Sequence, residues 1–392
     1  MGDFIIVPEQ PLTPPVASRA PPPTRRLEPT PTSVTIFIGR TASGPMFTPV
    51  ACQSLQDYDS TFSPTNPHGD LSRAVRLFFH NAGPRCHVVR IRNREVQEDR
   101  PPRAADYRDV LVAISIEVPD FNLLVLPRDD GVDPATQQEI WRMASHFCRE
   151  KRAMLLIDAP SEWAGLVDVQ DAWSDLGILR IREGLALESA AMFYPRVMVR
   201  DGDAEVPTGC CGAMAGLMTS FDDAHGVWTP AAGLDAVIAG IKGLEHETTE
   251  DDASLFGSEG VDVLRSLPEG IVSWGARTMA GHTGSWWKFI PVRRMALFVE
   301  QSIERGIEWV ASEPNDALLW QGIQANVGSF LDDIWKRGAL EGDTAEKAYF
   351  VKCDAETTTE DDIARGQVHF HVGFAPMRPE EFMVLEFTRS TR

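Results

Sequence analysis

The segment between Val272 and Ile307 constrains the fold more than any other part of the chain. Its first half places aromatic side chains around a glycine-rich turn, namely Trp274, Trp286, Trp287 and Phe289. Its second half repeats apolar residues at the spacing of one helix face, namely Val292, Met295, Ala296, Val299 and Ile303. The segment holds few residue types that suit acid-base or nucleophilic chemistry. We therefore predict a packing element here and not a reaction centre.

Length and charge limit the classes of protein that the chain can belong to. Its 392 residues suffice for about two or three domains. The net charge of −20, from 57 acidic and 37 basic residues, opposes binding to nucleic acid or to an anionic membrane. The chain has no apolar run long enough to span a membrane, and its first residues lack the pattern of a secretory signal. We therefore expect a cytoplasmic protein with neither nucleic acid nor membrane as a partner.

The cysteines indicate free thiols. Six of them are spread over the chain without a CxxC pair, which favours neither a zinc site nor a disulfide framework. Cys210 and Cys211 are adjacent in the run GCCGAMAGLM. We interpret them as small buried helix residues, and a reactive vicinal pair is the alternative.

The N-terminal region is expected to be an arm. Nine of the 28 prolines lie between Pro8 and Pro31, which favours extended backbone without a core of its own. Ahead of them, an apolar run has the pattern of a short strand: Phe4, Ile5, Ile6 and Val7. Such a strand must pair with a sheet elsewhere, and a disordered tail is the alternative.

The middle of the chain has the alternating pattern of an α/β protein. Apolar runs at Asn122–Leu126 and Met154–Ile157 flank a helical pattern from about Pro134 to Arg149. This order predicts a mostly parallel sheet that is buried on both faces. A further strand is expected over Met192–Val199, and the acidic stretch Leu244–Ser258 is expected to be a solvated loop.

The last part of the chain combines a long helix with strands. We expect Asn315 to cap a helix that continues to Gly338. One apolar face of this helix is formed by Leu319, Ile323, Val327, Phe330 and Ile334. Strands are then predicted at Ala348–Cys353, Gln367–Phe374 and Met383–Phe387. Both ends of the protein are therefore strand-like.

Residues suited to catalysis or metal binding are sparse. His369 and His371 lie two apart on a predicted strand and share a face, but a metal would require a third ligand. Asp158 follows a strand, where α/β proteins often carry functional residues, although the following Pro160 and Ser161 favour a helix cap. Neither a G-x-S-x-G nucleophile motif nor a phosphate-binding glycine loop is present. We predict no enzymatic activity, no cofactor and no metal.

Several motifs together resemble one family. They include, in order, DLSRAVRLFFHNAG, MLLIDAPSEWA, WGARTMAG, WWKFIPVRR and EPNDALLWQGIQANVGSFLDDIWKRGAL. Each is weak alone, but in this order they closely resemble contractile tail sheath proteins of myophage tails and phage-like contractile injection systems. The resemblance spans most of the chain from Thr32 to Phe387. A Pro-rich arm replaces the opening that is common in the family, and the stretch from Arg92 to Val118 is short where larger members carry an outer domain.

The resemblance implies a fold and a division into domains. The fold is α/β, with a mostly parallel, subtilisin-like but non-catalytic body, an α+β C-terminal sheath domain, and extended strand arms at both ends. Residues 1–32 are then a Pro-rich arm with an exchanged strand, and 33–105 an N-terminal α/β subdomain. Residues 106–280 are the subtilisin-like domain, and 281–392 the sheath domain.

The resemblance also implies the function and the partners. The chain is expected to polymerise with itself around an inner tube protein, to contract, and to contact baseplate and tail-terminator proteins. Two strands are expected to link subunits: Phe4, Ile5, Ile6 and Val7, and Met383, Val384, Leu385, Glu386 and Phe387. A helix is expected to face the tube, with Asn315, Gln324, Ser329, Asp333, Lys336 and Arg337 as candidate contacts. Lys336 and Arg337 also suit the negative end of the helix dipole, which is an equally good reading.

Two other functions remain open at this point. A baseplate or cap component of the same particle would bind at one end of it and not along its shaft. An α/β hydrolase-like enzyme is favoured only by the sheet architecture.

Overall fold

The structure, a computed structural model, describes residues 26–62, 70–91, 101–129, 131–165, 177–283, 285–377 and 383–391, without the side chains of Met383 and Val384. The predicted strand Phe4–Val7 and most of the Pro-rich arm lie outside these residues.

An eight-stranded sheet forms the centre of the body. Its strand order is β11-β10-β6-β5-β4-β1-β3-β2. All neighbours from β3 to β10 are parallel, and β2 and β11 are antiparallel strands at the two edges. The strands are β1 (Thr35–Gly39), β2 (Val50–Cys52), β3 (Cys86–Arg90), β4 (Leu123–Val125), β5 (Met154–Asp158), β6 (Ala190–Tyr194), β10 (Val261–Leu267) and β11 (Gly270–Ser273). The predicted largely parallel α/β sheet is confirmed.

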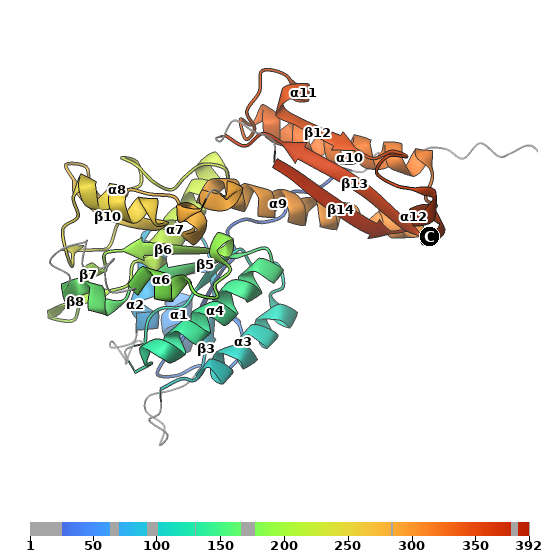
Figure 1. Cartoon of the computed structure of the whole chain (residues 1–392). Coiled ribbons are helices and arrows are strands. Elements are labelled where there is room, and N and C mark those ends of the chain that lie inside the picture. The colour runs from blue at the N-terminus through green and yellow to red at the C-terminus, as the bar shows by residue number, and fades with distance from the viewer. Residues whose placement is uncertain are drawn as a thin grey trace, which may run out of the picture.

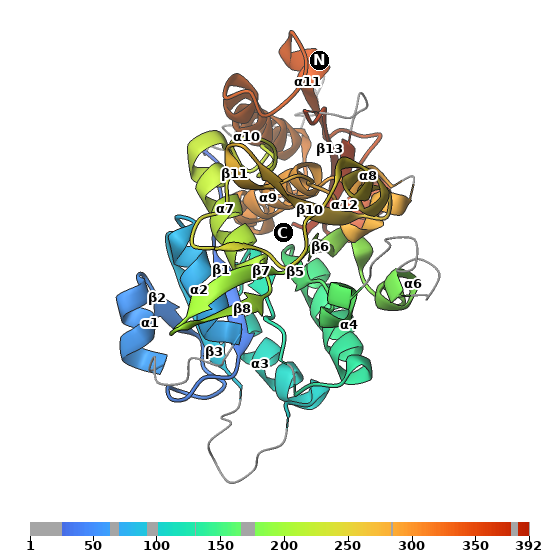
Figure 2. The ribbon, with the colours of Figure 1, turned by 90° about the vertical axis from the view of Figure 1, so that its left-hand side faces the viewer.

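Helices cover both faces of this sheet. Successive side chains of a strand point to opposite faces, and here the side chains on both faces are apolar and must be buried. In β1, Phe37 belongs to the core cluster on one face, and Ile36 and Ile38 to the cluster on the other. The first face is covered by α1 (Leu55–Phe62), α2 (Asp70–His80) and α7 (Cys211–His225). The second is covered by α3 (Ala104–Glu117), α4 (Pro134–Glu150) and α6 (Gly177–Arg182) (Figure 2). The predicted boundary at residue 105 passes through this single sheet, which contains strands from both of the predicted parts.

Two predictions about the body are wrong. The single strand expected over Met192–Val199 is two strands, because Pro195 has no N–H for a sheet ladder. The second, β7 (Val197–Asp201), belongs to a small sheet with β8 (Ala204–Thr208) and β9 (Gly243–Leu244). The acidic stretch expected to be a loop contains α8 (Glu250–Ser258), whose start is fixed by reciprocal hydrogen bonds between Thr249 and Asp252.

The C-terminal part is a second unit with its own core (Figure 1). An antiparallel sheet of order β12-β13-β14 packs its apolar face against the long helix α10. Side chains on that face of the sheet include Val368, Phe370, Val372, Phe374, Leu385 and Phe387. The elements are α10 (Ala317–Lys336), α11 (Ala345–Ala348), β12 (Tyr349–Lys352), α12 (Glu360–Ala364), β13 (Gln367–Phe374) and β14 (Met383–Ser390).

One helix, α9 (Ile290–Gly306), joins the two units. Ile290 and Leu297 belong to the core of the body, and Met295, Val299 and Ile303 belong to the C-terminal core. The apolar face predicted for this helix is buried throughout. Because each buried side chain of this size contributes about 1.5–3 kcal/mol, contacts on both sides hold α9 to both units.

A buried ion pair fixes α9 to the body. Both guanidinium Nη atoms of Arg294 donate to the Asp222 carboxylate of α7, at 2.8 and 2.6 Å. The two side chains are only 6% and 1% exposed. Arg294 Nη2 also donates to the Thr32 carbonyl oxygen at 2.9 Å, so the pair holds the segment that precedes β1 as well. Burial raises the pKa of Asp222, and Arg294 acts in the opposite direction.

The N-terminal segment continues from Thr32 along α9. Thr30 donates its backbone N–H to Ser302 Oγ at 3.1 Å. Leu27 is buried beside Gly306, where a Cβ would lie 2.3 Å from Leu27 Cγ. Gly306 therefore allows this close approach, and residues 27–32 attach the base of the arm to α9.

Removing one partner of the buried pair should destabilise the protein strongly. We expect Asp222→Asn to lower the free energy of unfolding by about 3–5 kcal/mol, because it leaves the Arg294 charge buried without a counter-charge. The matched control is Asp120→Asn. Asp120 is the exposed ion-pair partner of Arg305, which lies on α9 like Arg294, so this substitution should lower the free energy of unfolding by less than about 1 kcal/mol. Urea unfolding followed by circular dichroism measures both, and equal losses would contradict this account of α9.

Candidate functional site

The carboxyl edge of the parallel sheet is where α/β proteins usually bind ligands. The chain runs from β1 to β3 on one side and then to β4 on the other, so the strand order reverses between β1 and β4. At this point Arg40, which follows β1, forms a bidentate ion pair with Asp129, which follows β4. Their side chains are 11% and 13% exposed. A structural ion pair therefore fills the position where a ligand crevice is usual.

Asp158 ends β5 and is also used for packing. Its carboxylate accepts the backbone N–H of Cys211 at 2.8 Å, at the first turn of α7. A Cβ on Gly209 would overlap this carboxylate, so the backbone lies directly against it. Burial raises the pKa of Asp158, and the contacts with Cys211 oppose the shift. The sequence suggested a cap for the helix that follows β5, at Ser161–Gly165, but Asp158 instead accepts a hydrogen bond from the first residue of α7, far along the chain.

Asp262, on β10, is a buried carboxyl that the sequence analysis missed. Both of its oxygens accept the backbone N–H of Arg277, at 2.9 and 3.1 Å. Burial raises the pKa of Asp262 to about 8, and Arg277 opposes the shift. The contact attaches the loop after β11 to β10, and its partner lies 15 residues away, beyond the reach of a local sequence pattern.

The cysteines and the two histidines of β13 do not form a metal-binding group among the described residues. All six cysteines are buried and free, and burial raises the pKa of Cys210 and Cys211 well above the usual value. The two therefore lie at the start of α7 as small packed residues. His369 and His371 share the outer face of β13, and His369 Nδ1 lies 2.9 Å from Thr388 Oγ1 on β14. Within the described part of the chain, no group of three metal-ligating side chains comes together.

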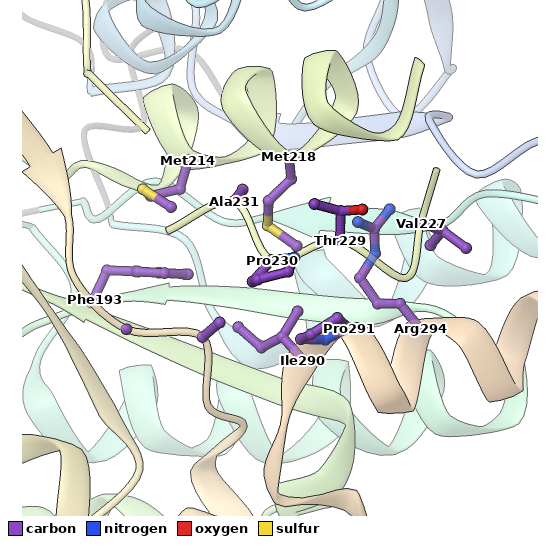
Figure 3. A pocket seen from close by; sticks show the side chains of 12 residues that line it. Phe193, Met214, Met218, Val227, Thr229, Pro230, Ala231, Ile290, Pro291 and Arg294 are labelled. Atoms are coloured by element: carbon purple, nitrogen blue, oxygen red, sulfur yellow. The ribbon is translucent and has the colours of Figure 1, made fainter. Parts of the chain in front are cut away.

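A small cavity lies where α9 meets the body. Met218 of α7 points toward Ile290 at the start of α9, and Met214 lies above Phe193 of β6 (Figure 3). The free space is about 10 Å³, which holds one water at most. This cavity is a small gap in the packing between α7 and α9 and has no room for a substrate.

The C-terminal sheet has two edge strands, β12 and β14. Met383–Phe387, the predicted linking strand, lie in β14, which pairs with β13 of the same chain from Met383 opposite Phe374 to Ser390 opposite Gln367. Phe387 stacks on Phe370 with ring centroids 4.9 Å apart. Exchange of this strand between subunits requires β14 to leave its own β13, and it stays a prediction.

The start of α10 differs from the prediction. Asp316 and not Asn315 caps the helix, because its carboxylate accepts the backbone N–H of Leu319 at 2.9 Å. Asn315 instead donates to the Gln367 carbonyl oxygen and accepts from Trp320 Nε1. Asn315 therefore ties the helix to β13, and both residue types cap helices equally well in sequence statistics.

The other predicted tube contacts divide into two groups. Gln324 donates to the Cys353 carbonyl oxygen at 3.2 Å, so its side chain is turned toward the residue that follows β12 in the same chain. Ser329 and Lys336 are exposed, and Lys336 pairs with Asp332 one turn earlier. Two further predicted residues contact other segments: Asp333 forms an exposed ion pair with Arg26, and Arg337 lies over the Trp228 ring at 5.2 Å. Ser329 and Lys336 are thus the members of the predicted set most available to a partner.

No helix in the described ranges combines the length and the apolar composition that a membrane span needs.

Comparison with known proteins finds one family match and several similar solved structures. Residues 282–388 match the family described as the phage tail sheath C-terminal domain. No curated protein sequence matches the chain. Among solved structures, a chain of the anti-feeding prophage (AFP) helical sheath in its contracted state is 26% identical, with 98% of each chain covered and a TM-score of 0.72.

Two further solved structures are similar over the whole chain. A chain of the AFP baseplate is 25% identical, with 100% of this chain and 99% of that chain covered and a TM-score of 0.72. A chain of the contracted PVC sheath complex, from an extracellular contractile injection system, has the same fold at 22% identity, with 99% and 98% covered and a TM-score of 0.73.

The chain is thus similar over nearly its whole length to solved contractile sheath proteins, and its residues 282–388 match a sheath family model. The predicted resemblance to contractile tail sheath proteins is confirmed.

The raised pKa of Asp262 predicts a pH dependence of stability. A carboxyl group with a folded pKa of about 8 and a usual value of 3.8 keeps its proton in the folded protein between these values. Its contribution to stability is therefore full below pH 3.8 and is lost as the pH rises toward 8. We expect the free energy of unfolding to fall more from about pH 5.5 to about pH 8.5 in the wild type than in Asp262→Asn. Equal pH slopes in denaturant unfolding would refute this protonation state.

Proposed function

We propose that this chain is the structural subunit of a contractile sheath, which polymerises around an inner tube and contracts to drive the tube through a target envelope. The likeness to the AFP helical sheath, over 98% of both chains, carries this proposal. The match of residues 282–388 to the sheath C-terminal domain supports it independently.

We further propose that the body is a non-catalytic, subtilisin-like domain. The Arg40–Asp129 pair at the sheet edge supports this reading, since it uses two charged residues for structure where an enzyme would bind substrate. The division into 33–105, 106–280 and 281–392 is proposed with it, and the two body parts share one sheet. The protein then acts without catalysis, cofactor or nucleotide.

The proposed links between subunits are strands added to the C-terminal sheet. The ladder between β13 and β14 would form equally well if β14 came from a neighbouring chain, as in domain swapping. Each backbone hydrogen bond contributes about 0.5–1.5 kcal/mol net, so a ladder of this length makes a durable joint. Leu385 and Phe387, buried against α10, would anchor the exchanged strand. The N-terminal strand Phe4–Val7 is proposed to add at an edge of the same sheet in another subunit.

The proposed tube contact is the exposed side of α10, including Ser329 and Lys336. The opposite side of this helix is buried against the C-terminal sheet, so the helix is held rigidly while it faces a partner. Contraction is then a change between two packings of the same rigid subunits.

We propose self-association as the main interaction, with baseplate, tail-terminator and tube proteins as further partners. The particle is proposed to assemble in the cytoplasm as a phage tail or a phage-like injection device. The likeness to a chain of the AFP baseplate favours a second candidate, a component that binds at the baseplate end. Electron microscopy of native particles labelled on this chain separates them, because the sheath lies along the shaft and the second candidate at one end.

Deleting Met1–Gln10 tests the proposed arm. Negative-stain electron microscopy should show rings or tubes for the full chain and only unassembled subunits for the deletion, because the deletion removes Phe4–Val7. The matched control deletes only Gly2 and Asp3, which keeps this strand and should leave assembly intact. Tubes that form and contract normally without Met1–Gln10 would overturn the role of the arm.

A further inference from the structure

Two cysteines lie directly opposite each other on neighbouring strands of the body. β2 and β3 are antiparallel, and their register pairs Cys52 with Cys86. Side chains of directly opposed residues point to the same face of a sheet, and both cysteines belong to the core cluster beneath α1 and α2. The other four cysteines lie outside the strands. The fold therefore brings together two thiols that are 34 positions apart in the sequence.

The separation of this pair suits a disulfide bond. Residues directly opposite in an antiparallel ladder have Cα atoms about 4.5–5.5 Å apart. Disulfide bonds join residues whose Cα atoms are about 4.4–6.8 Å apart and whose Cβ atoms do not point away from each other. The ladder between β2 and β3 thus holds the two thiols where a bond needs little movement of the backbone.

Burial protects the reduced pair. Cys52 and Cys86 are only 0% and 1% exposed. Burial raises the pKa of Cys52 to about 11, and Asp57 raises it further. Burial also raises the pKa of Cys86 well above its usual value, and the neighbouring Cys52 adds to this shift. Because the thiolate and not the thiol attacks an oxidant, both groups react slowly while β2 stays in place.

The strand that carries Cys52 is placed to open locally. β2 has three residues and lies at the outer edge of the sheet beside α1 (Figure 2), and among the described residues β3 is its only neighbouring strand. Within β2, Ala51 is exposed and Val50 is partly exposed. Segments with few buried contacts open at a lower free-energy cost than the centre of a sheet. Such an opening admits a small oxidant to Cys52 while the body stays folded.

We propose that Cys52 and Cys86 form a reversible disulfide bond with each other when the protein meets a small-molecule disulfide such as oxidised glutathione. The Cys52 thiol loses its proton and attacks one sulfur of the oxidant, which releases one small thiolate and leaves a mixed disulfide. Cys86 then loses its proton and attacks the Cys52 sulfur, and the second small thiolate leaves. The two released thiolates take up the two protons, so two cysteines are oxidised and one small disulfide is reduced. This chemistry does not depend on the proposed sheath function.

The bond would fasten one edge of the body. It closes a loop from residue 52 to residue 86, which contains α1 and α2. A cross-link that closes a loop of this length restricts the unfolded chain and so stabilises the folded protein. In a reducing cytosol the pair stays as thiols, and the bond forms in an oxidising environment.

Peptide mapping of the full chain tests the bond. The folded protein is incubated with oxidised glutathione, its remaining thiols are blocked with iodoacetamide in urea, and its tryptic fragments are analysed without reduction. We expect fragments 41–73 and 86–90 to be joined, and dithiothreitol to separate them. The bond should form faster at about pH 9 than at about pH 7, because more thiolate is present. Unchanged thiols, lasting glutathione adducts, or a bond to any other cysteine would overturn the proposal.

Two variants measure the effect of the bond on stability. Cys52→Ala should abolish the cross-link, and Cys86→Ala gives the same test if the first variant does not fold. The matched control is Cys148→Ala, which removes an equally buried cysteine of α4 and should keep the cross-link. Oxidation should raise the Tm of the wild type and of Cys148→Ala by about 5 °C and leave that of Cys52→Ala unchanged. An equal rise in all three, or a cross-link that forms without any rise, would contradict the stabilising role.

Discussion

The buried contact between Arg294 and Asp222 is the interaction on which the remaining arrangement depends. It joins α9 to α7 of the body, and through the Thr32 carbonyl oxygen it also positions the chain that enters β1. The same helix buries Val299 and Ile303 in the C-terminal core. Removing either charge would leave the other in an apolar interior, which costs several kcal/mol. The two units are therefore fixed to one helix, and a force applied to the C-terminal sheet reaches the body through α9.

This rigidity fits a protein that works by assembly. Buried carboxyl groups, which enzymes often use in reactions, here accept backbone N–H groups of distant segments: Asp158 that of Cys211, and Asp262 that of Arg277. The Arg40–Asp129 pair fills the reversal point of the sheet in the same way. The body is thus held by polar contacts at the ends of its strands, and the edges of the C-terminal sheet carry the proposed links between subunits.

Local patterns in the sequence were sufficient for the long helices α4, α9 and α10 and for several strands, among them β4, β5 and β13. The apolar spacing of α10 identified its one buried face. In α9 the predicted face is buried, but Leu297 and Phe298 outside that face are buried as well, because the helix packs on both units. Thr249 and Asp252, three residues apart, have the spacing of a capping box at the start of α8, although the acidic composition of this stretch suggested a loop. The partners of Asp158 and Asp222 lie 53 and 72 residues away, so only the folded sheet brings them together. Pairing of β14 within or between chains uses the same ladder, and no sequence pattern distinguishes the two.

Exchange of β14 between subunits is the central claim, and a mixed disulfide experiment tests it most directly. His369 and Thr388 face each other across β13 and β14, and the natural cysteines are all buried. One variant carries only His369→Cys and the other only Thr388→Cys. The two variants are mixed in the unfolded state, refolded so that they assemble into one polymer, and then oxidised. The account predicts a disulfide-linked dimer of the two variants in the polymer, and none in unassembled subunits. A polymer that forms normally but yields no such dimer, while a chain with both substitutions forms the bond internally, would contradict it.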